Sequence, residues 1–101
     1  MDRYSIKHDP LAVDELQEAA DWYESQSAGA GARFTAAVKA KLLQIASSPR
    51  RWAVEKDGTR HALLRPFQYM IVFRQQKDVI VVIAYAHTSR RPGYWRKRLS
   101  R

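Results

Sequence analysis

Apolar residues recur at helical spacing in two stretches of the first half of the chain. Asp9-Pro10 has the pattern of a helix start, because an aspartate caps the first turn and proline suits its first position. Ser48-Pro49 has the pattern of a helix end. We therefore predict helices over 10–25 and 30–47, joined as a hairpin by a glycine-containing loop. Their apolar stripes are Ala12, Leu16, Ala19, Ala20 and Tyr23, then Phe34, Val38, Leu42 and Ile45. Trp22 is expected to pack as well, with an exposed partner contact as the alternative.

The second half of the chain changes to strand-like runs rich in branched and aromatic residues. The runs at 59–65, 67–75 and 78–87, separated by short connections, predict a three-stranded antiparallel meander. Alternation near residues 4–8 predicts one more short strand. Helices that bury their stripes on a sheet make an α+β fold, and we expect one domain over 1–101. The helices would then cover one face of the sheet and leave the other face open.

Charge is divided unevenly along the chain. Residues 1–49 hold five Lys or Arg against seven Asp or Glu, a net of −2, whereas residues 50–101 hold thirteen against three, a net of +10. Basic charge clustered in one region is the electrostatic footprint of proteins that bind nucleic acid or other polyanions. The acidic residues of the first helix are expected to form a solvated face.

Several function classes are disfavoured by composition. The chain has no cysteine, and its His, Asp and Glu residues have no metal-ligand spacing, so we predict no metal and no cofactor. The longest apolar run, 79–86, is too short to span a bilayer. The first residues do not resemble a secretory signal, and we predict a cytoplasmic protein that does not act on membranes.

The candidate chemistry lies at the end of the last predicted strand. His87 follows the strand and could transfer protons near neutral pH. Metal-free RNA cleavage needs such a group together with cations around the phosphate. The candidate phosphate ligands are Arg60, Arg65, Arg74 and Arg90, and the candidate stacking aromatics are Tyr94 and Trp95. For Trp95, packing of the basic tail onto the sheet is the favoured alternative.

Nearly the whole chain resembles the RelE/ParE toxins of bacterial type II toxin–antitoxin modules. The resemblance is carried by the element order, by the run from Arg65 to Arg74, by the strand 78–86, and by His87-Thr88-Ser89-Arg90. It implies a growth-inhibiting toxin that a cognate antitoxin neutralises, in a toxin–antitoxin hetero-oligomer.

The target implied by the resemblance depends on the subgroup. ParE-like toxins poison DNA gyrase, and RelE-like toxins cut messenger RNA on the ribosome. Met70 stands where RelE-like nucleases often carry arginine, which favours the ParE-like reading. A nuclease would use His87, Arg65, Arg90 and Tyr94 as its catalytic set. Target binding in either case is assigned to Arg60, Arg74, Arg91, Trp95, Arg96, Lys97 and Arg98. A basic interaction module without toxicity is a third possibility.

Overall fold

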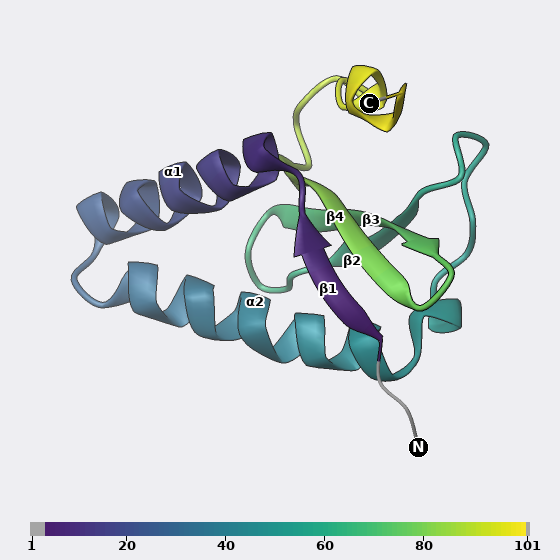
Figure 1. Ribbon diagram of the computed structural model, residues 1–101. Coiled ribbons are helices and arrows are strands. Elements are labelled where there is room, and N and C mark those ends of the chain that lie inside the picture. Colours follow the sequence, from purple (N-terminus) through teal and green to yellow (C-terminus); the bar gives the residue numbers. More distant parts are fainter. Residues whose placement is uncertain (1–3, 101) are drawn as a thin grey trace.

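The computed structural model describes residues 4–100 (Figure 1). The first three residues, on which the expectation of a non-secretory start partly rests, and the basic residue Arg101 lie outside this range. The two predicted helices are confirmed as α1 (Pro10–Gln26) and α2 (Ala30–Ser47), which run side by side as a hairpin (Figure 1). The Asp9 carboxylate accepts the Leu11 N–H at 2.9 Å, as expected of a cap.

The turn of the hairpin is stabilised by Glu24 near the end of α1. Its carboxylate accepts the N–H groups of Gly29 at 3.0 Å and Gly31 at 2.9 Å, at the start of α2. These two hydrogen bonds lower the pKa of Glu24. The helices also approach each other closely at Gly31, because a Cβ atom there would lie 2.8 Å from the carbonyl oxygen of Ala20.

Residues 4–100 form a sheet of four strands in the order β1-β4-β3-β2. Their bounds are β1 Ser5–His8, β2 Arg60–Leu63, β3 Tyr69–Gln76 and β4 Val79–His87. The meander of β2, β3 and β4 is antiparallel, as predicted, and β1 adds to the outer side of β4 in parallel. The α+β fold class is therefore confirmed, and the sheet as a whole is mixed rather than antiparallel.

Apolar side chains cover both faces of the sheet. On the helix side, Phe34 and Ile45 of α2 pack against Ile71, Phe73 and Val82, and all five are buried. On the other side, Trp95 is buried against Val72, Ile83, Ala84 and Ala86. The expectation of an open second face was wrong, because the C-terminal segment, residues 88–100, folds back over it and contains the short 3₁₀ helix η2 (Arg96–Ser100). The expectation that Trp95 packs onto the sheet is confirmed.

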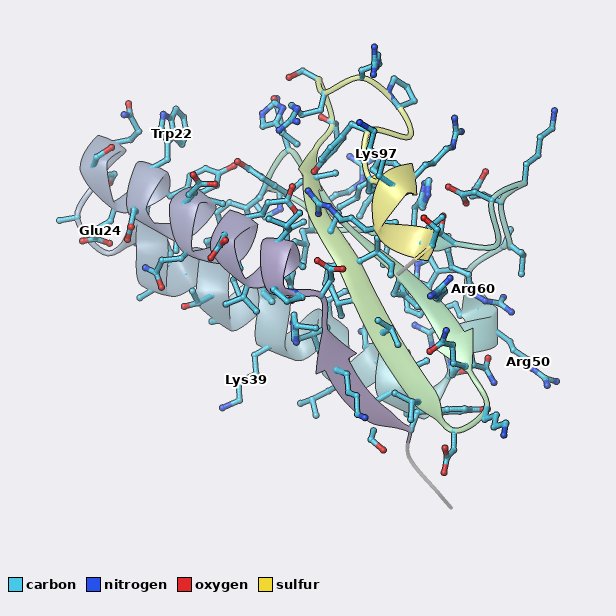
Figure 2. All side chains as sticks on the ribbon, turned by 45° about the horizontal axis from the view of Figure 1, so that its top comes forward. Trp22, Glu24, Lys39, Arg50, Arg60 and Lys97 are labelled. Atoms are coloured by element: carbon cyan, nitrogen blue, oxygen red, sulfur yellow. The ribbon has the colours of Figure 1, made fainter. Side chains whose placement is uncertain are left out.

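Trp22 is exposed, whereas the sequence analysis expected it to pack. The side chain is 56% exposed and contacts the neighbouring Tyr23 edge to face. Figure 2 shows it standing off α1 near the hairpin turn, well away from Lys97 on η2. Neither described helix is long and apolar enough to cross a membrane.

Candidate functional site

A β-bulge in β4 determines which side chains reach the candidate site. Val72 pairs with Ala84 and Phe73 pairs with Val82, so Ile83 is an extra residue without a directly opposed partner. Regular alternation from Val82 would turn Ala84 toward the helices. The bulge shifts the alternation by one residue, and Tyr85 lies in the helix-side cluster instead. His87 follows on the same face, paired with Tyr69 and in edge-to-face contact with its ring at 5.1 Å.

His87 lies in a small depression with acidic walls. The depression is lined by Glu15, Glu18, Tyr69, Tyr85, His87 and Arg90. The ring Nδ1 of His87 accepts the backbone N–H of Ser89 at 3.0 Å and lies 2.7 Å from the Ser89 hydroxyl. Because Nδ1 is an acceptor, the neutral ring carries its proton on Nε2. His87 is therefore oriented by its own loop, with two carboxylates and one guanidinium around it.

Glu15 is the centre of a hydrogen-bond network that joins α1, β4 and the C-terminal segment. Its carboxylate accepts both terminal nitrogens of Arg98 at 2.9 and 3.0 Å, the Tyr94 hydroxyl at 2.7 Å and the Tyr85 N–H at 3.1 Å. Arg98 also donates to the Ile83 carbonyl at 2.9 Å. The side chains of Arg98 and Glu15 are only 11% and 14% exposed. Removing one member of such a buried pair typically costs about 3–5 kcal/mol, because the other charge is left uncompensated.

Two tyrosines of this network have perturbed acidity. Burial, together with the contact to Glu15, raises the pKa of Tyr94, and burial raises the pKa of Tyr85. The Tyr85 hydroxyl lies 2.8 Å from Nε2 of His8, whose pKa is lowered by burial. The Tyr94 ring also carries the Arg90 guanidinium on its face, 4.0 Å from the ring centroid.

A second carboxylate, Asp57, holds the other side of the C-terminal segment. It accepts Nε1 of Trp95 at 3.1 Å, the Thr59 N–H at 3.0 Å and the Thr59 hydroxyl at 2.6 Å, and it lies 3.6 Å from Nε of Arg96. Burial opposes the ionised form of Asp57, but these hydrogen bonds outweigh it and the pKa is lowered. A shallow pocket of about 430 Å³ opens beside this anchor, with Arg90 and Arg96 in its wall.

The predicted binding cations fall into two groups. Arg98 is held by Glu15, Arg74 donates to the Leu99 carbonyl at 3.2 Å, and Arg60 donates to the Trp52 carbonyl at 2.6 Å. These three are partly buried and bind within the protein. The others are exposed on the segment that covers the second face, and we call them the exposed cationic set: Arg90, Arg91, Arg96 and Lys97.

Arg65 lies apart from His87. It is exposed and lines a groove of about 320 Å³ at the edge of the sheet together with Lys41, Trp52, His61 and Leu63. The catalytic set proposed for a nuclease is therefore divided between this groove and the depression around His87, with Tyr94 engaged by Glu15. Figure 2 shows Arg50 and Arg60 on the side of the molecule away from Trp22.

The sequence analysis missed Glu15 and Asp57 as site residues. Glu15 was assigned to a solvated acidic face, and this assignment was wrong, because Glu15 is largely buried under Tyr94 and Arg98. Its partner Arg98 is 83 positions away, so no local pattern marks the pair. Among residues 4–100, no group of three or more His, Asp or Glu side chains could hold a metal ion.

Comparisons with known proteins agree with this architecture. The sequence pattern of the family described as "ParE toxin of type II toxin-antitoxin system, parDE" matches residues 6–92. Among solved structures, a chain of the chromosomal ParDE toxin–antitoxin system from P. aeruginosa superposes with a TM-score of 0.71 at 17% identity, covering 84% of this chain and 96% of that one. No match was found among curated proteins. Since the family pattern spans most of the chain, this protein belongs to the ParE toxin family of type II toxin–antitoxin systems.

Proposed function

We propose that this toxin is a non-enzymatic inhibitor of DNA gyrase that acts in the cytoplasm and is neutralised by a cognate antitoxin. Membership of the ParE family supports the toxin role. The exposed cationic set supports a binding mechanism, because it offers a concentrated positive surface to an acidic protein or a protein–DNA complex. The carboxyl-terminal segment that presents it is anchored to the fold at two points.

The environment of His87 is the observation that favours target binding over RNA cleavage. A general acid or base for RNA cleavage must sit beside a phosphate that cations stabilise. Glu15 and Glu18 line the depression around His87, and among the described residues of this lining Arg90 is the one cation. Glu18 would repel a phosphate at this place, and the carboxylate of Glu15 is already bound by Arg98. The raised pKa of Tyr94 and its hydrogen bond to Glu15 also make this hydroxyl a poor proton donor.

The proposal is tested with purified toxin in two parallel assays. We expect the wild-type protein to inhibit DNA supercoiling by gyrase, while messenger RNA from arrested cells stays intact. His87→Ala should weaken inhibition only modestly, since His87 serves at most as a contact. Codon-positioned mRNA cleavage that disappears in His87→Ala would instead establish the ribonuclease alternative, in which loss of one acid or base typically costs about 10²–10⁴-fold in rate.

The groove beside β2, which Arg65 lines, is suited to bind the antitoxin. In the part of the chain that the structure describes, β2 has a sheet neighbour on one side only. The Leu64 N–H binds the Tyr69 carbonyl, so the main-chain groups of His61 and Leu63 point away from β3 to the free edge. Leu63 is exposed, and Lys41 and Arg65 flank the groove. An extended acidic segment with an apolar residue could add here as a further strand.

Replacing Leu63 by proline tests this docking place. Proline is tolerated in an edge strand where its missing N–H would face solvent. Leu63→Pro should therefore leave the fold intact and weaken antitoxin binding by roughly tenfold through one lost hydrogen bond. Leu63→Ala, which keeps the N–H, separates the contribution of the side chain. Isothermal titration with the cognate antitoxin measures both variants, and wild-type affinity in Leu63→Pro would place the antitoxin elsewhere.

A further inference from the structure

The C-terminal segment has little regular structure of its own that could fix its position. The only regular element in its described part, η2, has five residues, and short 3₁₀ helices depend on outside contacts. Five cations lie between positions 90 and 98, and their mutual repulsion opposes a compact arrangement. The apolar contribution comes from Trp95, with Tyr94 and Leu99 partly buried beside it. The placement of the segment therefore depends on contacts from the rest of the fold.

Glu15 supplies the largest group of those polar contacts. It binds Arg98 through both carboxylate oxygens and accepts the Tyr94 hydroxyl, and these two residues flank the buried Trp95. The same carboxylate accepts the Tyr85 N–H of β4, which ties the segment to α1 and to the sheet at once. The pKa of Arg98 is raised by the hydrogen bonds from its side chain to Glu15, so the guanidinium keeps its charge in this contact.

The orientation of the exposed cationic set follows from this anchor. Arg96 and Lys97 lie between Trp95 and Arg98, and Arg90 stacks on the ring of Tyr94. Arg98 also contacts the Tyr94 ring, 5.4 Å from its centroid. Loss of the Glu15 contacts would release Tyr94 and Arg98 together. Arg90 would then stack on a ring that is no longer fixed, and Lys97 would lose the anchor beside it, whereas Arg96 would keep its contact with Asp57. Figure 2 shows Lys97 on η2, and the residue is exposed.

We infer that Glu15 is a positioning residue for toxicity: it does not meet the target but holds Tyr94 and Arg98, and thereby fixes the surface that does. This inference rests on the proposed function in assigning the target contact to the exposed cationic set. Asp57 also holds the C-terminal segment in place, from the opposite side, through its contacts with Trp95 and Arg96.

The test replaces Glu15 by glutamine, which keeps the size of the side chain and removes its charge. Trypsin cleaves after arginine and lysine in segments that open, so cleavage after Arg96 and Lys97 reports release of the segment. We expect cleavage to accelerate by about tenfold to hundredfold, the range for losing hydrogen bonds to a charged group. The toxin level needed for growth arrest should rise by at least about tenfold, while helical content and the main melting transition persist.

Two further variants make the comparison specific. Asp14→Asn removes the same charge from an exposed position on the same helix and should change neither cleavage nor arrest. Glu15→Lys combined with Arg98→Glu reverses the ion pair and should restore part of the protection lost in Glu15→Lys alone. If Glu15→Gln melts as a whole, Tyr94→Phe replaces it in the same assays, because it removes one hydroxyl donor and keeps the ring.

The outcomes separate this inference from the proposed target. Faster cleavage together with weaker arrest supports the role of Glu15, whether or not gyrase is the target. A segment that stays protected in Glu15→Gln, or a released segment that arrests growth as well as the wild type, overturns it. Absence of supercoiling inhibition by the wild-type toxin contradicts the proposed function alone, since cleavage and growth arrest are measured without gyrase.

Discussion

Replacing Ile71 by aspartate is expected to unfold the protein. Ile71 is fully buried in the middle of β3, against the helices and paired with Tyr85 and Ala62. The substitution removes an apolar side chain, which typically costs about 2–5 kcal/mol. It also buries a carboxylate without a partner, which adds about 3–5 kcal/mol. The sum is comparable to the whole stability of a small domain, about 5–15 kcal/mol.

Circular dichroism and the fluorescence of the buried Trp95 measure this effect. Val82→Asp, at another fully buried position on the same face, should behave in the same way. Leu63→Asp is the matched control, because Leu63 lies in the same sheet but is exposed. A cooperative melt of Ile71→Asp close to that of the control would show that the core is not where the structure puts it.

Neutralising three exposed cations is expected to remove most of the toxin's activity on its target. The combined variant Arg91→Gln, Arg96→Gln and Lys97→Gln changes side chains that are exposed, and Arg96 lies 3.6 Å from the Asp57 carboxylate. Cations at an interface contribute on the order of 1 kcal/mol each, so supercoiling inhibition should weaken by roughly hundredfold. The remaining inhibition should also depend less on salt, because fewer charges are screened.

The control for this prediction makes the same change in net charge at exposed positions outside the C-terminal segment. Arg33, Lys39 and Arg50 are exposed and lie outside the C-terminal segment, so their combined change to glutamine lowers the net charge equally. This control should inhibit supercoiling nearly as well as the wild type. Equal loss in both triple variants would mean that overall charge, and not the exposed cationic set, governs target binding.

Local sequence alone determined the elements of this fold. The helix bounds follow from the Asp9 cap, the proline stop and the apolar stripes, because these signals act over a few residues. The three strands of the meander follow from short runs and short connections, for which antiparallel pairing is the simple arrangement. The unequal charge of the two halves is likewise a property of the sequence.

Tertiary structure alone decided how the site is assembled. The bulge at Ile83 turns Tyr85 and His87 to the helix side, and alternation along the strand contains no sign of it. The C-terminal segment covers the second face because Trp95 is buried against that face and Glu15 binds Arg98. Partners separated by most of the chain leave no local pattern, since their attraction exists only once the fold has brought them together. For the same reason we expected Glu15 to be solvated from the sequence alone. In the structure Glu15 is largely buried and anchors the surface that we propose meets the target.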